Sequence, residues 1–117
     1  MAICIKIKSS NVDLVEKIIE KIDSHIISTW SYDDEFDFTH ETGQWRNHAW
    51  ISKKIAEKNL ITFGIIGRRD EPMTKTKYSI FHARFAEMLL THFDDEIEEI
   101  RLTSMPIREI DILPCSV

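Results

Sequence analysis

The sequence contains few of the residues that break, cross-link or anchor a chain. Three glycines, three prolines and two cysteines among 117 residues argue against flexible linkers and against a disulfide framework. Cys4 and Cys115 lie near opposite ends without a Cys-x-x-Cys pair, so we expect two reduced thiols. No apolar run approaches the roughly 20 residues that span a bilayer, and no basic leader with a cleavage site is visible. These features predict a soluble, cytoplasmic chain that binds no membrane.

Recognisable catalytic and metal-binding motifs are absent as well. There is no glycine-rich phosphate loop and no Gly-x-Ser-x-Gly motif. None of the five histidines falls in a His-x-x-x-His or His-Glu-x-x-His pattern. His82 and His92 would stand about 15 Å apart on one helix, too far to share a metal ion. The carboxylates at 33–37 lack the spacing of an EF-hand loop. We therefore expect no catalytic residue, no metal and no cofactor.

The composition is that of a globular protein with an acidic surface. Hydrophobic residues make up 43% and charged residues 30% of the chain, and the length suits a single domain over residues 1–117. Twenty acidic against fifteen basic side chains give a formal net charge of −5. This excess disfavours direct binding of nucleic acid or anionic membranes and favours a basic protein partner.

Hydrophobic periodicity predicts a mixed fold. Alternating Ile3, Ile5 and Ile7 indicate an opening strand, and helical spacing indicates helices over 12–26, capped by Ser10, and over 78–93. Further strands are expected at 36–40, 48–55, 60–67 and 97–102, and the tail 107–117 is a weaker candidate for an edge strand. The predicted fold class is α+β, a single domain with a mostly antiparallel sheet of about five strands packed by two main helices.

Three expectations concern the middle of the chain. The run 60–67 is apolar on both faces, so we expect it in the middle of the sheet with both faces covered. The segment 56–59 should form a tight connection that pairs this strand with 48–55. The polar run 68–77 should form a long loop, and a loop of this length is unusual enough to suggest a functional role.

The run from Trp30 to Trp45 interleaves aromatic rings with carboxylates. We expect the rings to anchor the run and the carboxylates to face water, as a negative surface on which a basic partner docks. A solvated acidic turn without a partner explains the same carboxylates. Trp45 is of a residue type that often anchors interfaces, but it could equally belong to the core. Arg68 and Arg69 offer a weaker second surface. The candidate partner-binding residues are Asp33, Asp34, Glu35, Asp37, Glu41, Trp45, Arg68 and Arg69.

Two segments resemble the signature segments of bacterial immunity proteins that neutralise toxins of contact-dependent growth inhibition systems. The first is the Trp-x-x-Asp-x-x-x-Asp-Phe-Thr run from Trp30 to Thr39 with Gln44-Trp45, and the second is the aromatic and histidine-containing run from Tyr78 to Phe93. The resemblance implies inhibition by binding, without chemistry, and makes His40, His82 and His92 framework residues. It implies a basic nuclease as the partner, a tRNA-targeting RNase being one form. The chain would act as a monomer or in a 1:1 complex with the toxin's C-terminal domain.

Two alternatives remain open at this point. The chain could be a small enzyme or ligand-binding domain whose pocket, between sheet and helices, uses His40, His82 and Glu87. It could also be a structural subunit that dimerises through an exposed sheet edge.

Overall fold

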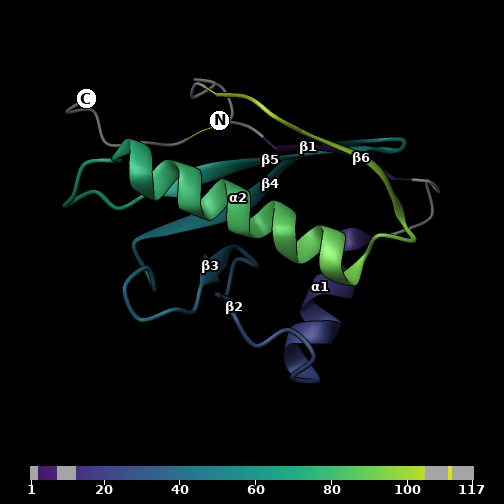
Figure 1. The fold of residues 1–117 in the computed structure, drawn as a ribbon, viewed down its shortest axis with the longest axis horizontal. Coiled ribbons are helices and arrows are strands. Elements are labelled where there is room, and N and C mark those ends of the chain that lie inside the picture. The colour runs from purple at the N-terminus through teal and green to yellow at the C-terminus, as the bar shows by residue number, and fades with distance from the viewer. Residues whose placement is uncertain (1–2, 8–12, 105–110, 112–117) are drawn as a thin grey trace.

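The strands join one antiparallel sheet in the order β2-β3-β4-β5-β1-β6 (Figure 1). The computed structural model describes residues 3–7, 13–104 and 111. Its elements are β1 (Ile3–Ile7), α1 (Leu14–Asp23), β2 (Trp30–Tyr32), β3 (Phe38–His40), β4 (Ala49–Glu57), β5 (Leu60–Gly67), α2 (Lys75–His92) and β6 (Ile97–Leu102). The predicted α+β fold is confirmed, with β2 as a strand that sequence periodicity missed. The edge strand expected at 107–117 falls, apart from Asp111, outside the described residues.

One face of the sheet packs against both helices. Alternate side chains of β1 and β5, among them Ile5 and Phe63, are buried in one core with Ile18 of α1 and Phe85 of α2. In Figure 1, α2 runs along the sheet, and α1 lies near the C-terminal end of α2. The Lys21 ammonium of α1 fixes this placement, because it donates a hydrogen bond of 2.7 Å to the carbonyl of His92.

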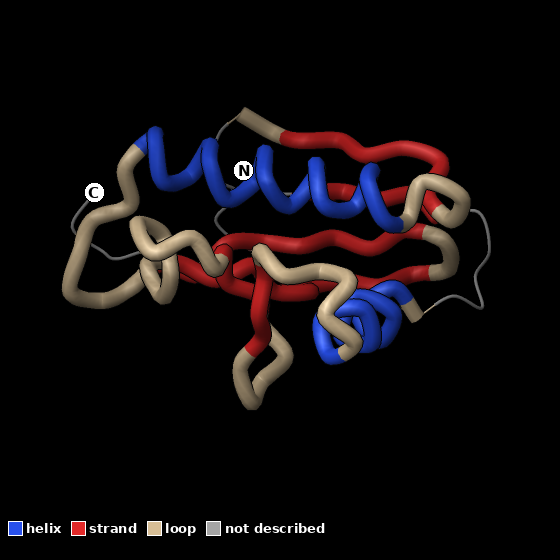
Figure 2. Tube along the Cα trace, turned by 60° about the horizontal axis from the view of Figure 1, so that its bottom comes forward, coloured by secondary structure: helices blue, strands red, loops and turns tan. Residues whose placement is uncertain are grey.

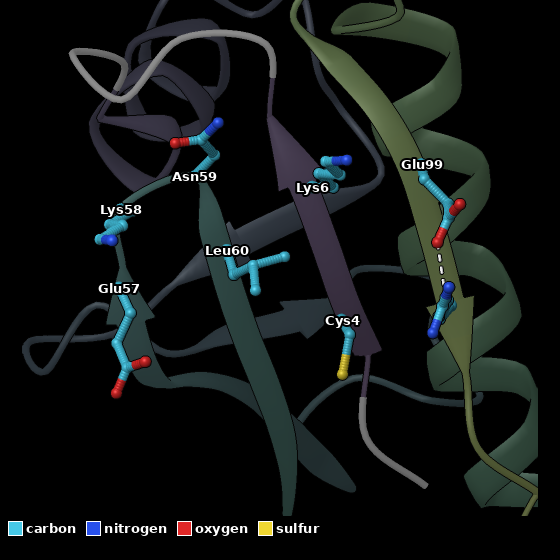
Figure 3. A pocket seen from close by; sticks show the side chains of 8 residues that line it. Cys4, Lys6, Glu57, Lys58, Asn59, Leu60 and Glu99 are labelled. Atoms are coloured by element: carbon cyan, nitrogen blue, oxygen red, sulfur yellow. Dashed lines mark hydrogen bonds and ion pairs between the residues drawn. The ribbon is translucent and has the colours of Figure 1, made fainter.

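The opposite face of the sheet is open over β1, β5 and β6. Figure 3 shows Cys4 and Lys6 of β1 beside Leu60 of β5 on this face. These side chains line a shallow depression of about 740 Å³, and Leu60 is 54% exposed. The expected central place of β5 is correct, since it pairs with β4 and β1. The expectation that both of its faces are covered is wrong at Leu60, which is exposed on the face that neither described helix covers.

Both helices begin where a side chain caps them, and neither start matches the sequence prediction. The Asp13 carboxylate accepts the N–H of Glu16 at 3.1 Å, so Asp13, rather than Ser10, caps α1. That helix ends at Asp23, before His25 adopts a left-handed φ of 64°. The Thr74 hydroxyl accepts the N–H of Lys77 at 3.0 Å and starts α2 three residues before the predicted Tyr78. The long polar loop is thereby shortened to 68–74.

The central hairpin of β4 and β5 closes through two residues, Lys58 and Asn59. Lys58 has a left-handed φ of 51°, which a tight hairpin turn requires. The predicted tight connection is therefore confirmed. In the part of the chain that is described, neither helix is both long and apolar enough to cross a membrane.

Candidate functional site

The acidic run is carried by the hairpin of β2 and β3, whose strands are anchored in the core. Trp30 pairs with His40 and Tyr32 pairs with Phe38 across the two strands. The Trp30 ring packs edge-on against Phe85 of α2, with ring centroids 5.3 Å apart. In Figure 2 the turn of this hairpin projects from the body at the bottom of the view. The aromatic side chains thus hold a protruding turn on a rigid base.

The turn between the strands, Asp33–Asp37, is organised by the carboxylate of its first residue. Asp33 Oδ1 accepts the backbone N–H groups of Glu35 and Asp37, each at 3.0 Å. The N–H of Phe36 also donates to the Asp33 carbonyl at 3.0 Å. An aspartate that bonds to the backbone two residues ahead forms an Asx turn. The Asp33 side chain thus shapes the turn, and its expected contact with a partner stays a prediction.

The tip of the turn exposes two carboxylates and one aromatic ring. Asp34, Glu35 and Phe36 are exposed, and Phe36 has a left-handed φ of 61° and an exposed fraction of 54%. Its ring lies 6.0 Å from that of Tyr32, whose hydroxyl donates to Asp23 at 2.7 Å. That hydrogen bond raises the pKa of Tyr32. The sequence prediction of a strand over 36–40 is wrong at Phe36, which belongs to the turn.

Asp37 differs from the other carboxylates of the turn because it is buried. It is 8% exposed, and burial raises the pKa of its carboxyl while a hydrogen bond with Ser52 of β4 acts in the opposite direction. We expected the carboxylates of this run to face water and its aromatic rings to be buried, and this expectation is wrong at two neighbouring positions. Phe36 faces water, and Asp37 joins the turn to β4.

The last two candidates of the acidic run lie beyond β3. Glu41 forms an ion pair with Arg46, with 3.3 Å between carboxylate oxygen and Nε. Trp45 is half-buried and packs against the core. Both positions are therefore partly committed to the folded body, and the freely presented side chains are those at the tip of the turn.

The arginine-containing loop 68–74 forms a separate surface. Arg68 is paired with Asp70 in the same loop at 2.6 Å, which lowers the pKa of the Asp70 carboxyl, and Arg69 is exposed. Glu71 joins the loop to the body, because it contacts His48 at 2.7 Å and the Lys77 ammonium at 3.0 Å. Hydrogen bonds from these two partners lower the pKa of Glu71. The loop is thus fixed to the start of β4 and to α2, and no ion pair between described residues joins it to the acidic turn.

A cleft of about 380 Å³ lies where α2 passes the end of β3. We name it the His40 cleft; its lining includes His40, Gln44, Trp45, Ile80, Arg84 and Glu87. It brings together two of the three residues expected in a pocket between sheet and helices, His40 and Glu87. The third residue, His82, is fully buried and hydrogen-bonds through Nδ1 to the carbonyl of Tyr78 at 2.7 Å, outside this lining.

Two residues of these surfaces were not predicted from the sequence, namely the exposed Phe36 and Arg84 in the lining of the His40 cleft. Phe36 alternates with its neighbours as a strand residue would, and only the preceding Asp33-Asp34 signals a turn. Arg84 stands three residues before Glu87 on α2, a spacing that indicates an ion pair on a helix surface. That spacing could have indicated the pair, although the cleft beside it depends on tertiary contacts.

Comparison with known proteins finds no relative of this chain. No family model, curated protein or solved structure matches it. Over residues 3–7, 13–104 and 111, no group of three His, Cys, Asp or Glu side chains could hold a metal ion.

Proposed function

We propose that this chain is a bacterial immunity protein that binds a cognate toxin domain in the cytoplasm and blocks the toxin's active site. The toxin of this proposal is a basic nuclease, with a tRNA-targeting RNase as one form, bound in a 1:1 complex. The immunity protein contributes no chemistry. Asp34, Glu35 and Phe36 form its primary contact, which we call the docking tip.

The conformation of Phe36 carries the proposal. A left-handed backbone costs a non-glycine residue about 1–2 kcal/mol, and glycine or asparagine would avoid much of this cost. Phe36 is also more than half exposed to water, so its ring gains only part of the free energy that full burial would give. A bulky ring that is unfavourable for both backbone and hydration suits a residue whose ring is buried by a partner.

The charges around Phe36 favour a basic partner. Asp34 and Glu35 are exposed beside it, and the chain as a whole carries a formal charge of −5. Carboxylates at the rim of an interface speed the encounter with a positively charged surface. A nuclease binds the phosphates of its substrate with such a surface, so the docking tip would compete for the same groups.

The first experiment captures the partner and measures its association rate. Tagged protein is incubated with lysate of the source bacterium and washed at low and high salt, and the retained basic protein is identified. Purified toxin domain is then bound to wild type and to the double variant Asp34→Asn, Glu35→Gln. We expect the variant to associate up to about tenfold more slowly at low salt and to show a flatter salt dependence.

A matched variant separates local from overall charge. Asp94 and Asp95 follow α2, are exposed, and lose the same charge in the double variant Asp94→Asn, Asp95→Asn. We expect this control to associate at close to the wild-type rate. If both variants associate equally slowly, net charge alone steers the encounter. If neither changes the rate, the docking site lies elsewhere.

The second candidate function is a ligand-binding domain or small enzyme. The His40 cleft favours its ligand-binding form, because two of the three predicted pocket residues line one cavity. A titration of that cleft tests it without the toxin.

A further inference from the structure

The His40 cleft presents a hydrogen-bond donor from a buried imidazole. His40 is 5% exposed; its Nδ1 lies 2.8 Å from the Thr42 hydroxyl and accepts the backbone N–H of Thr42 at 3.4 Å. An Nδ1 that accepts an N–H leaves the proton of a neutral imidazole on Nε2. Burial and the nearby charge of Arg84 lower the pKa of His40, which keeps the ring neutral. Within the described chain no hydrogen bond occupies Nε2, so its N–H is available to a ligand.

A donor and an acceptor stand side by side on α2 at the rim of the cleft. The Arg84 guanidinium contacts both carboxylate oxygens of Glu87, at 3.2 and 3.3 Å, and both side chains are more than half exposed. Arg84 has further N–H groups beyond those in this pair. A ligand can therefore accept a hydrogen bond from Arg84 and donate one to Glu87 along the same edge.

The charges around the cleft sum to zero. Arg84 is balanced by Glu87, and the neighbouring Arg46 is balanced by Glu41. With His40 neutral, the cleft has no net charge with which to attract an anion or a cation. Trp45 and Ile80 supply apolar walls, and the Trp45 ring offers a surface for a planar group. A volume of about 380 Å³ is within the range of small-molecule pockets.

We infer that the His40 cleft binds a neutral, planar molecule of nucleobase size with a lactam edge, an N–H beside a C=O. Glu87 accepts the lactam N–H, Arg84 donates to its carbonyl, and His40 Nε2–H donates to a second acceptor on the ring. This site is separate from the docking tip, and its occupancy does not depend on whether a toxin binds there.

Inosine and adenosine provide a matched pair of probes. They share the sugar and ring system, but inosine has the lactam N–H and C=O where adenosine has a bare ring nitrogen and an amino group. Calorimetric titration should give inosine an affinity about tenfold higher, equivalent to about 1.4 kcal/mol. With its ring held by His40 in the same orientation as inosine, adenosine would face Arg84 with a donor and Glu87 with an acceptor, so neither hydrogen bond along this edge can form. Inosine should also shift the amide-region NMR signals of the Trp45 indole and the Arg84 Nε–H.

Two variants test whether Arg84 and Glu87 form the hydrogen bonds to the lactam edge. Arg84→Met and Glu87→Met change exposed helical positions to another good helix former and should remove the preference for inosine. The control, Glu99→Met with Arg101→Met, removes an exposed ion pair on β6 and should leave the preference intact. Equal affinity for both nucleosides or no saturable binding of inosine would overturn the inference. Tighter binding of benzoate, a planar anion, than of inosine would also overturn it, because the cleft would then prefer a charged ligand.

Discussion

Replacing Phe36 by asparagine should separate binding from stability. Asparagine tolerates a left-handed backbone, so the variant Phe36→Asn regains about 1 kcal/mol of the strain at φ 61°. It loses the ring contact with Tyr32, worth about 0.5–1.5 kcal/mol. These effects oppose each other, and we expect the free energy of unfolding to stay within about 1 kcal/mol of wild type.

Binding should respond very differently to the same change. A buried aromatic anchor at an interface contributes at least about 1.4 kcal/mol, so Phe36→Asn should raise the dissociation constant for the toxin at least tenfold. The loss should appear mainly in the dissociation rate, measured by biolayer interferometry, while urea unfolding measures stability. Leu90→Gln is the control, because Leu90 is 56% exposed on α2 and its loss should affect neither quantity. Unchanged affinity with Phe36→Asn, or an equal loss with Leu90→Gln, would show that the Phe36 ring is not an anchor of the interface.

Three further predictions concern the scaffold. Phe85→Ala should lower the free energy of unfolding by about 3–5 kcal/mol in urea titrations, because Phe85 is fully buried against three rings, whereas Leu90→Ala should change it by less than about 0.5 kcal/mol. Because burial raises the pKa of Asp37 above 3.8, its proton stabilises the fold at low pH, and this stability falls as the pH rises through the folded-state pKa. Asp37→Asn should therefore have little effect near pH 3 and stabilise the protein near pH 7; destabilisation near pH 7 would contradict the burial argument. The pKa of Glu71 is lowered in the folded state, so its ionised form stabilises the fold, and Glu71→Gln should destabilise the protein near pH 7. The difference in stability between the variant and wild type should vanish as the pH falls from 4.5 through the folded-state pKa. A difference in stability that does not depend on pH would rule out the ion pairs of Glu71 as its cause.

Periodicity predicted the regular elements well where one pattern ran long enough. Strand β1 and helix α2 each carry a sustained repeat and β5 a continuous apolar run, and each was placed within a few residues of its observed bounds. The short strand β2, of three residues, is too brief for any repeat to show and is defined by its pairing with β3. The coverage of β5 was mispredicted because an apolar sequence does not show on which face a helix will lie.

The acidic turn was predicted from the sequence, but the surroundings of its individual side chains were not. The sequence indicated an acidic aromatic run, and the docking tip lies within it. It could not indicate that Asp33 bonds to the backbone, that Asp37 is buried beside Ser52, or that Phe36 is exposed. Each of these depends on the backbone path of one turn, where a change in a single φ angle reverses which side chains face water.

Occlusion of the toxin's active site is tested most simply by the nuclease activity of the purified toxin domain during titration with this protein. If the docking tip occludes the active site, activity falls to zero at one equivalent, and Phe36→Asn requires a large excess to reach the same inhibition. A stable complex that retains full nuclease activity, or complete inhibition by Phe36→Asn at one equivalent, would contradict the claim that the docking tip occludes the active site.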